Sequence, residues 1–542
     1  MGKKKISFDK ISEMPEVAIA EGSMMVNKTG SWRYLRPIYR EKLAPCRKGC
    51  PLGTDIPRVI SLINQKEFEQ AWELVVETNP MPAVSGHACY HSCENSCTRI
   101  ALDDRVGVQA LERFLADRFS DRDFPYQPDP KNGKKIAVVG AGPAGLAAAW
   151  ILVRRGYQAE VFEKGREAGG MLRNSIPGYK LSRETLDRDL ARLESFGIML
   201  RLNSEIDGKD DLARLKGEYD AVIVATGTIP PEPELLPGES PPLVYKGLEF
   251  LEGVNAGSIE TAGPEAVVIG TGNTAVDSAR ASRRLGASAR VITLCGRQEM
   301  AATNEEIRAA EGEGVEFLYQ AEIISARVDS GKILIEMKGI KTAEEGEDPP
   351  VGEDRFIPGS EFTIAADTLV EARGEVSSLT LLGDETADGK TVFTSGDAVT
   401  GPSSISHSMK SGISAAISAI SSFEGAQPED REMAAFNLMG MNRDCFAKAA
   451  GVELPVRELP EGFLDFSELT ETISEEEAVY ESSRCISCGV CNFCDSCMTF
   501  CPDFCIHRTE EGYQVDLDYC KGCGICSQEC PRDVIDLIQE GS

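Results

Sequence analysis

The sequence predicts an α/β protein with a cysteine-rich segment at each end. Two observations predict the α/β body. The strand-like run at residues 136–139 is followed at once by glycines and a helical pattern, and the same order recurs after residues 267–269. The third observation is that, of eighteen cysteines, five lie between Cys46 and Cys97 and eleven between Cys485 and Cys530. We therefore expect metal sites at both ends of the chain.

The length, net charge and apolar content of the chain disfavour several classes of protein. A chain of 542 residues suggests three or four domains of roughly 100–200 residues each. The net charge of −30 would repel phosphate backbones and disfavours nucleic acid as a partner. No stretch approaches the ~20 apolar residues that span a bilayer, and no apolar segment follows the basic residues 1–5. We expect a cytoplasmic protein without membrane insertion, whose cysteines are thiols rather than disulfides.

The first strand–glycine–helix unit has the pattern of a dinucleotide site. The run Gly140-Ala141-Gly142-Pro143-Ala144-Gly145 fits G-x-G-x-x-G, in which the glycines allow a tight turn, close approach of a pyrophosphate, and packing of helix on strand. The next strand ends in Glu163, which is placed to accept the ribose hydroxyls of an adenosine. A lone glycine motif can be a structural turn, but the strand, helix and carboxylate together favour nucleotide binding.

The second unit repeats this arrangement. Gly270-Thr271-Gly272-Asn273-Thr274-Ala275 again follows a strand and precedes a helix, with alanine in place of the third glycine. Two such sites in one chain suggest a flavin and a nicotinamide nucleotide side by side.

The C-terminal cysteines form two bacterial ferredoxin runs. These are Cys491-x2-Cys494-x2-Cys497-x3-Cys501-Pro502 and Cys520-x2-Cys523-x2-Cys526-x3-Cys530-Pro531. In such runs three close thiolates bind one [4Fe–4S] cluster and the fourth crosses to the other cluster. Zinc is the alternative, but zinc patterns rarely repeat this spacing twice.

Residues 40–425 resemble the small, electron-input subunit of bacterial glutamate synthase and the matching N-terminal half of dihydropyrimidine dehydrogenase. The resemblance rests on Gly140–Gly145, Glu163, Gly169-Gly170, Ala225-Thr226-Gly227, Gly270–Ala275 with Asp277, and Gly396-Asp397. It implies that the first fold binds FAD, that an NAD(P) domain is inserted in the FAD domain, and that the helix after Gly401-Pro402 points its positive N-terminus at the flavin ring. The implied cofactor-binding residues are Gly140, Gly142, Pro143, Ala144, Gly145, Glu163, Lys164, Gly170, Ala225, Thr226, Gly227, Gly396 and Asp397 for FAD, and Gly270, Gly272, Asn273, Thr274, Ala275, Asp277 and Arg297 for NAD(P)H.

The choice of coenzyme depends on the end of the strand at residues 290–294. The family usually has two adjacent arginines there for the 2′-phosphate of NADPH, whereas this sequence has Cys295-Gly296-Arg297. Losing one arginine weakens a phosphate clamp, and no carboxylate replaces it, so we lean slightly to NADH. A solvated surface arginine is the alternative for Arg297. Because Cys295 is the one cysteine in the nucleotide domains, dithiol exchange, and hence a disulfide reductase, is not expected.

The N-terminal cysteines match the family only in part. By resemblance, Cys50, Cys89 and Cys93 bind one cluster with Glu112 on the following helix as fourth ligand, although a solvated helix residue is the alternative for Glu112. Cys46 and Cys97 supply only two of the four ligands of a second cluster, a half-site. The C-x2-C pair that normally precedes Cys46 in the family is missing from residues 36–45.

A C-x2-C pair of the same context occurs instead near the C-terminus. Cys485 and Cys488 follow a Glu-rich helical segment as the family's pair does, so we expect them to complete the half-site of Cys46 and Cys97. Four clusters would then use fifteen cysteines and Glu112 and leave Cys295, Cys445 and Cys505 over. A ferredoxin register slipped to use Cys488, or a separate small site using Cys505, remains open, and we expect three or four clusters.

These parts predict an electron-transfer flavoprotein. We expect it to move electrons between NAD(P)H, FAD and [4Fe–4S] clusters, and to serve a ferredoxin or a catalytic oxidoreductase subunit within a hetero-oligomer. A glutamate synthase small subunit and a non-enzymatic polyferredoxin scaffold are the alternatives. His87, His91, His407 and His507 form no acid–base or nucleophile pattern and are expected to be structural. The expected domains are 1–34 (arm), 35–125 (helical iron–sulfur), 134–240 and 371–425 (FAD), 241–370 (NAD(P)), 426–480 (linker) and 481–542 (α+β, ferredoxin-like).

Overall fold

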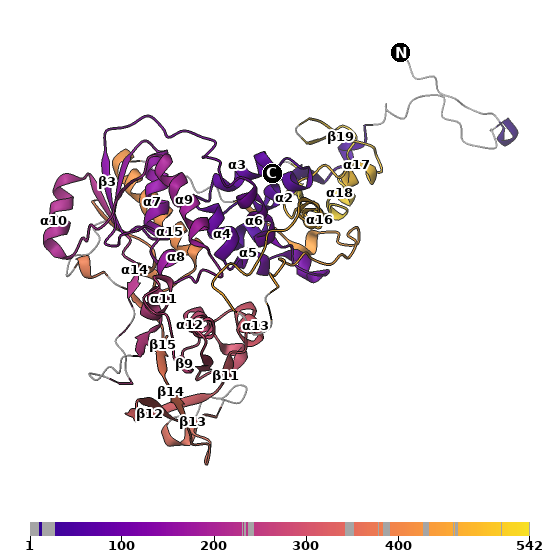
Figure 1. Cartoon of the computed structure of the whole chain (residues 1–542). Helices are drawn as coiled ribbons and strands as arrows, with labels where there is room; N and C mark the ends of the chain where they lie inside the picture. Colours follow the sequence, from indigo (N-terminus) through magenta and orange to yellow (C-terminus); the bar gives the residue numbers. More distant parts are fainter. Residues whose placement is uncertain are drawn as a thin grey trace. The chain divides into compact units, whose positions relative to one another are not determined.

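A computed structural model of the chain describes residues 10–13, 28–229, 231, 235–236, 243–341, 352–377, 379–382, 391–425, 433–458, 460, 464–510 and 512–540 (Figure 1). They divide into two compact units. The smaller takes its residues from 1–45, 432–448 and 486–542, and the larger from 46–431 and 449–485. None of the described helices has the length and apolar content needed to cross a bilayer.

The first nucleotide-binding domain of the larger unit is built on a parallel sheet of five strands in the order β17-β6-β3-β4-β5. Its central strand β3 has four buried residues in succession, as expected for a strand covered on both faces. The elements of this domain are β3 (Lys135–Val139), α7 (Pro143–Arg154), β4 (Gln158–Phe162), α8 (Met171–Asn174), α9 (Arg183–Ser195), β5 (Met199–Arg201), α10 (Gly208–Glu218), β6 (Ala221–Val224), β7 (Thr228–Ile229), β16 (Val376–Ser377), β17 (Val392–Thr394), α14 (Asp397–Thr400) and α15 (Ile405–Glu424).

A second parallel sheet, in the order β11-β10-β9-β15-β8, interrupts the first domain. Its strands lie in sequence between β6 and β17, which are neighbours in the first sheet, so the predicted insertion of one nucleotide-binding domain in the other is confirmed. The elements are β8 (Val244–Lys246), α11 (Gly247–Asn255), β9 (Glu265–Ile269), α12 (Asn273–Arg284), β10 (Ser288–Ile292), α13 (Asn304–Gly312), β11 (Glu316–Leu318) and β15 (Thr368–Glu371), with a separate antiparallel sheet of β12 (Ala321–Asp329), β13 (Lys332–Gly339) and β14 (Phe362–Ala366).

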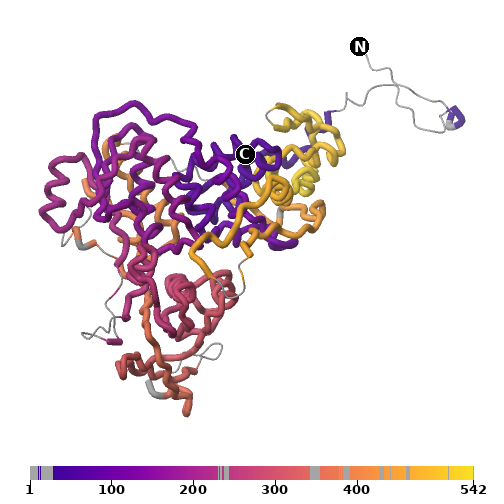
Figure 2. Tube along the Cα trace, in the orientation of Figure 1, coloured from indigo at the N-terminus to yellow at the C-terminus, as the bar shows by residue number. Residues whose placement is uncertain are grey.

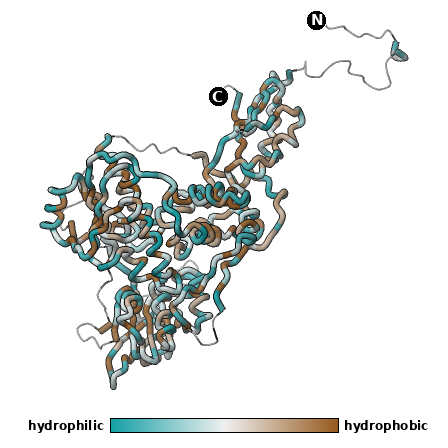
Figure 3. The backbone as a smooth tube through the Cα atoms, turned by 45° about the horizontal axis from the view of Figure 1, so that its top comes forward, coloured by the Kyte–Doolittle hydropathy of each residue, from teal (hydrophilic) through white to brown (hydrophobic). Residues whose placement is uncertain are grey.

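The third part of the larger unit is helical. Apolar side chains of its helices contribute to one core. Figure 3 shows hydrophobic and hydrophilic residues interspersed along the backbone of the chain. The apolar pattern from Ile56 to Thr78 is split into two helices by Lys66, whose φ of +63° ends the first. The helices are α1 (Pro45–Gly49), α2 (Ile56–Asn64), α3 (Phe68–Val76), α4 (Pro82–Ala88), α5 (Ser92–Asn95), α6 (Val108–Arg118) and α16 (Glu475–Ser483).

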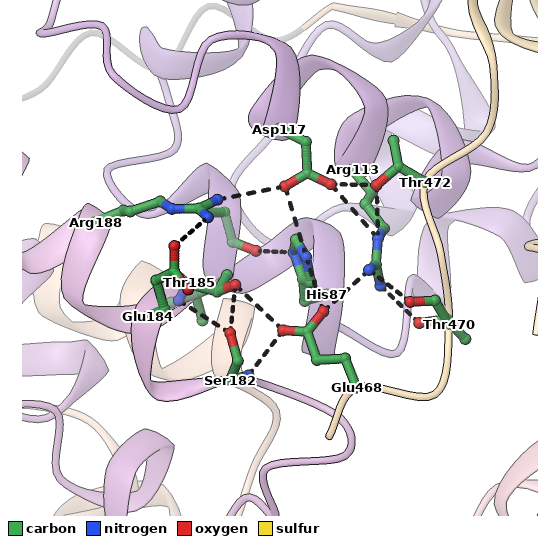
Figure 4. Close-up of polar contacts among 12 residues, drawn as sticks. His87, Arg113, Asp117, Ser182, Glu184, Thr185, Arg188, Glu468, Thr470 and Thr472 are labelled. Carbon is green, nitrogen blue, oxygen red and sulfur yellow. Dashed lines mark hydrogen bonds and ion pairs between the residues drawn. The ribbon is translucent and has the colours of Figure 1, made fainter. Parts of the chain in front are cut away.

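Part of the expected linker is held by buried polar contacts. Figure 4 shows the segment at residues 468–472 against helices α4, α6 and α9. Arg113 donates to Thr470 and pairs with Glu468 at 3.0 Å, while Glu468 also accepts from the backbone N–H of Ser182. Burial and Arg113 lower the pKa of His87, which lies against Glu468. The segment therefore belongs to the larger unit, and His87 serves its packing.

The smaller unit has an α+β fold whose sheet joins the two ends of the chain. Strand β1 pairs with β21 antiparallel, from Leu35 opposite Gln539 to Tyr39 opposite Ile535 (Figure 2). Residues 35–44, expected in the helical domain, thus lie with the C-terminal cysteines. Its elements are β1 (Leu35–Tyr39), β2 (Lys42–Leu43), β18 (Ala434–Ala435), α17 (Ser496–Thr499), β19 (Ile506–Arg508), β20 (Tyr513–Val515), α18 (Ile525–Gln528) and β21 (Ile535–Gln539).

Ion pairs fix the N-terminal segment in this unit. Arg33 forms a two-pronged pair with Glu540, with distances of 2.6 and 2.9 Å. Lys42 is buried and contacts the carboxylates of Asp533 and Asp536, each at 2.8 Å. Removing one partner of a bidentate or buried ion pair costs folding free energy, so the N-terminal segment with strand β1 is an integral part of the smaller unit.

Candidate nucleotide and iron–sulfur sites

The first glycine loop is shaped by close backbone contacts. Gly140 has φ +107°, and a Cβ there would lie 2.4 Å from the carbonyl oxygen of Ala225. A Cβ on Gly145 would lie 1.9 Å from the carbonyl oxygen of Gly140, so helix α7 packs directly on the turn. A Cβ at Gly142, in contrast, would meet nothing described closer than Gly170 at 4.0 Å. The loop therefore leaves room at its middle glycine, where a pyrophosphate approaches in this motif.

Glu163 lies beside this loop. Its Oε2 accepts a hydrogen bond from the backbone N–H of Ala141 at 2.9 Å, and its Oε1 accepts from Gly165 at 2.8 Å. The carboxylate is thus held at the end of β4 next to the glycine turn, where a ribose acceptor is needed.

Asp397 and helix α15 complete the first site. The Oδ1 of Asp397 accepts from the hydroxyls of Ser403 and Ser408, at 2.5 and 2.7 Å. Helix α15 packs on α7 so closely that a Cβ on Gly412 would lie 1.9 Å from the carbonyl oxygen of Ala144. The structure thereby brings the sequence-predicted residues at Gly396-Asp397 to the same side of the sheet as the glycine loop.

The second glycine loop has the same form. A Cβ at Gly270 would lie 2.2 Å from the carbonyl oxygen of Ala372, whereas one at Gly272 would meet no described atom within 4 Å. Asn273 begins helix α12 and accepts from the backbone N–H of Thr303 at 3.2 Å. An open glycine in front of a helix N-terminus is a place for a phosphate.

Asp277 of helix α12 forms a buried ion pair between the two nucleotide domains. It contacts Lys180 at 2.6 Å and accepts from the hydroxyl of Tyr179, and Lys180 also contacts Glu306 at 2.7 Å. Burial opposes the charge of Lys180, but Asp277 and Glu306 raise its pKa above the ordinary value. The guanidinium of Arg284 lies 3.8 Å from the centre of the Tyr179 ring. Lys180 and Glu306 are not predicted from the sequence, because a lysine and a glutamate far apart in the chain form no recognisable motif.

Arg297 is engaged by a neighbouring carboxylate. Its guanidinium pairs with Glu311 at 2.9 and 3.2 Å on the surface of the second domain. The backbone N–H of Gly296 donates to Glu299 at 2.9 Å. A 2′-phosphate would have to compete with Glu311 for this arginine.

The four expected ligands of the N-terminal cluster line one cavity. Its empty volume, open solvent included, is about 610 Å³, and Cys50, Cys89, Cys93 and Glu112 are among its walls. Three thiols and a carboxylate in one cavity fit a [4Fe–4S] cluster.

Glu112 is already held by three donors. Its Oε2 pairs with the Nε2 of His91 at 2.7 Å, and its Oε1 accepts from Ser85 and Asn79. Burial disfavours the charge on His91, but Cys89 and Glu112 raise its pKa to about 10. His91 has φ +44° and lies in the cavity wall, and its place beside Glu112 is a contact that the sequence pattern does not reveal.

This cavity borders helix α15. The Sγ of Cys89 lies 3.9 Å from the Oγ of Ser406, which lines the cavity and sits in the first turn of α15. The helix that contributes to the first nucleotide site therefore also touches the N-terminal cysteine site.

Cys46, Cys97 and Cys485 pack at the edge of the same hydrophobic core in the larger unit. Arg99 donates to the carbonyl oxygen of Arg484, the residue before Cys485. Arg484 is buried and pairs with Glu481. The chain around Cys485 is thus fixed to the segment that follows Cys97. Cys488 belongs to the smaller unit.

The C-terminal cysteines share a core in the smaller unit. Within it, a cavity of about 320 Å³ is lined by Cys501, Cys520, Cys523 and Cys526, the set that the ferredoxin pattern assigns to one cluster. Cys505 lines it as well. The other set is Cys491, Cys494, Cys497 and Cys530, of which Cys491, Cys497 and Cys530 contribute to the same core and Cys494 is exposed.

Three family models match the chain. Pyridine nucleotide-disulphide oxidoreductase matches residues 134–412, dihydropyrimidine dehydrogenase domain II, 4Fe-4S cluster, matches residues 39–124, and 4Fe-4S binding domain matches residues 513–536. The first covers the two nucleotide-binding sheets, the second covers the cysteines from Cys46 to Cys97, and the third covers those from Cys520 to Cys530.

Curated relatives agree with these matches. NADPH-Fe(3+) oxidoreductase subunit beta of Geobacter sulfurreducens is 35% identical over 63% of this chain and 52% of its own length. Putative oxidoreductase YgfK of Escherichia coli is 29% identical over 90% of this chain and 48% of its own length. The glutamate synthase [NADPH] small chain of Escherichia coli is 33% identical over 61% of this chain and 73% of its own length.

The chain spans about half the length of the first two relatives and nearly three quarters of the third. Two glycine loops on parallel sheets, cysteine cavities at both ends, and the matched models lead to one assignment. The chain belongs to the pyridine nucleotide-disulphide oxidoreductase family and carries matches to two 4Fe-4S domain models.

Proposed function

We propose that this chain is an electron-transfer subunit that moves electrons between NAD(P)H, FAD and a series of [4Fe–4S] clusters, to or from a ferredoxin or a catalytic partner. The contact between Cys89 and Ser406 carries the proposal. It joins a cluster cavity to the helix of the FAD site without an intervening domain, which is what an electron path requires.

Different parts of the chain would bind the different cofactors. When bound, the nicotinamide would supply two electrons as hydride, the flavin would convert them to single electrons, and the clusters would carry these singly. The open glycines Gly142 and Gly272 admit the two dinucleotides. Helix α15, capped by Ser404, presents its positive N-terminus where negative charge on the flavin is stabilised.

The cluster ligands are assigned on the same basis. We assign the eight ferredoxin cysteines to two clusters, and Cys50, Cys89, Cys93 and Glu112 to a third. For a fourth cluster we keep the expected ligands Cys46, Cys97 and Cys485, each of which packs at the edge of the core of the larger unit. Iron counted per FAD in a Cys46→Ala, Cys97→Ala variant and in Cys485→Ala tests this. A loss of about four irons in both supports the fourth cluster, and full iron in either contradicts it.

For the coenzyme we keep a slight preference for NADH. The names of two relatives carry NADPH, which favours the phosphorylated coenzyme. Against this, the single arginine at the expected position, Arg297, is paired with Glu311.

A glutamate synthase small subunit is the second candidate. Its support is the relative of that name, of which this chain covers 73%. Glutamine-dependent glutamate formation with a large amidotransferase subunit from the same cell would favour it, whereas the smaller unit with its ferredoxin cysteines favours electron delivery elsewhere.

The test uses anaerobic, purified full-length chain. NADH or NADPH should reduce its FAD, and the reduced protein should pass electrons to a low-potential ferredoxin or a viologen dye. A protein whose flavin neither nucleotide reduces cannot have this function. Anaerobic co-purification from the native cell then identifies the partner.

A further inference from the structure

The cavity of the smaller unit contains one thiol more than a cluster uses. A [4Fe–4S] cluster of the ferredoxin type takes four cysteine ligands, and the ferredoxin spacing supplies Cys501, Cys520, Cys523 and Cys526. Cys505 is the fifth cysteine in the same wall, and its side chain is only 3% exposed. Its Sγ lies 3.5 Å from the Sγ of Cys501, whose exposure is 7%.

The two thiols are held by different pieces of backbone. Cys501 ends the segment after α17, where its N–H donates to the carbonyl oxygen of Met498. Cys505 immediately precedes β19, and its carbonyl oxygen accepts from the N–H of Asp516 at 2.7 Å, so the β19–β20 hairpin fixes it. Removing the Cys501 side chain would therefore leave Cys505 in place.

We propose that Cys505 is a reserve ligand for the iron that Cys501 binds. When Cys501 is absent or detaches, the Cys505 thiol binds the same iron as thiolate. In an exchange between the two, one iron–sulfur bond breaks and one forms. The proton leaves Cys505 for the sulfur of Cys501 across the 3.5 Å between them, and no electron is gained or lost. The inference rests on the assignment of the ferredoxin cysteines to clusters.

Two alternative roles for Cys505 predict different behaviour. Free cysteines are among the most buried residues, so Cys505 could serve packing alone. It could also bind a separate metal, but the five cysteines face one cavity rather than two. In both cases Cys505 would not preserve iron in a chain that lacks Cys501.

The experiment counts iron and sulfide per FAD in full-length chain purified without oxygen. The variants are Cys501→Ala, Cys505→Ala and the double variant, with Cys530→Ala as the control in the other ligand set. Alanine is used because a serine oxygen can itself bind iron. We expect Cys501→Ala and Cys505→Ala each to retain full iron, and the double variant and Cys530→Ala each to lose about four irons.

EPR spectroscopy distinguishes binding of Cys505 to the iron from a cluster that is retained without a replacement for Cys501. Reduced Cys501→Ala should give a cluster EPR signal changed from that of the native protein, and Cys505→Ala the native signal. Peptide mapping after alkylation of the holoprotein should find Cys505 protected in Cys501→Ala and reactive after iron chelation. Loss of about four irons from Cys501→Ala with FAD intact, or an alkylated Cys505 in that holoprotein, overturns the proposal.

Discussion

The Sγ of Cys89 lies 3.9 Å from the Oγ of Ser406, so an expected cluster ligand touches the first turn of the helix that serves the flavin site. Cys89 follows helix α4 of the helical domain, and Ser406 comes more than 300 residues later in the first nucleotide domain. Their contact places an expected cluster ligand beside an expected flavin site within the larger unit.

The first prediction concerns this contact. Cys89→Ala should remove about four irons, because a cluster without one of three thiolates is not retained. NAD(P)H should still reduce the flavin, whereas electron transfer to ferredoxin should fall at least tenfold. Stopped-flow absorbance and dye reduction measure the two steps. Cys295→Ala, in the second nucleotide domain, is the control and should change neither step. Ferredoxin reduction at the native rate in Cys89→Ala would mean that electrons leave by another route.

The coenzyme prediction uses the pairing of Arg297. Glu311→Gln frees this arginine for a 2′-phosphate, and because the lost pair is exposed to solvent, kcat/KM for NADPH relative to NADH should rise by no more than about fivefold. Gly296→Arg restores a second arginine and should shift the ratio on the order of 10–100-fold, from about 1.5–3 kcal/mol for a charge-assisted bond.

The site tolerates this substitution. A Cβ at Gly296 would come no closer than 3.5 Å, to Glu299, and the φ of −72° suits any residue. The control is Arg308→Gln, because Arg308 lies on helix α13 together with Glu311. An unchanged coenzyme ratio in both variants would place the phosphate site elsewhere.

The third prediction concerns the ion pair between the nucleotide domains. Lys180→Met takes away the cation that contacts Asp277 and leaves Glu306 with Arg280 at 2.8 Å, and removing one partner of a buried pair typically costs about 3–5 kcal/mol. The larger unit should therefore unfold at a lower temperature, and hydride transfer from NAD(P)H should slow because the domains lose their fixed contact.

Calorimetry and stopped-flow reduction of FAD measure these effects. Asp277→Asn in the Lys180→Met background removes the carboxylate left without its cation, and should recover much of the stability. A Lys180→Met protein with native melting temperature would show that the pair does not hold the domains.

The fourth prediction concerns strand β1. Gly522 has φ +71°, and a Cβ there would lie 2.0 Å from the carbonyl oxygen of Leu35. Gly522→Ala should displace the strand and destabilise the smaller unit, with loss of ferredoxin-type iron but not of FAD. Gly331→Ala is the matched control, since its φ is +82° and a Cβ would meet no described atom within 4 Å. Equal iron in the two variants would mean that β1 is dispensable.

Local patterns in the sequence predict the parts whose geometry depends on nearby residues. The glycine loops at Gly140 and Gly270 follow their strands directly, so turn, strand and helix are visible within a few residues. The ferredoxin cysteines likewise reveal themselves by spacing, and the insertion of one domain follows from family resemblance.

The contacts that sequence analysis missed join distant segments. The pairing of Leu35 with Gln539 and the contact of Lys180 with Asp277 each depend on the complete fold. The resemblance assigns Asp277 to nucleotide binding, but its carboxylate faces the domain junction. The burial of Glu112 cannot be read from its helix, because the donors Asn79, Ser85 and His91 come from other segments.

The most direct test of the account is an anaerobic titration of the isolated full-length chain with NADH or NADPH, followed by optical and EPR spectra of the same samples. The account predicts that the flavin absorbance bleaches and that signals of reduced [4Fe–4S] clusters appear without any partner. In Cys89→Ala the flavin should bleach but the signals of the remaining clusters should be diminished. A contradicting result is a flavin that the nucleotide reduces while no cluster signal appears, although a chemical reductant at the same potential does reduce the clusters. That result would exclude an electron path through this chain.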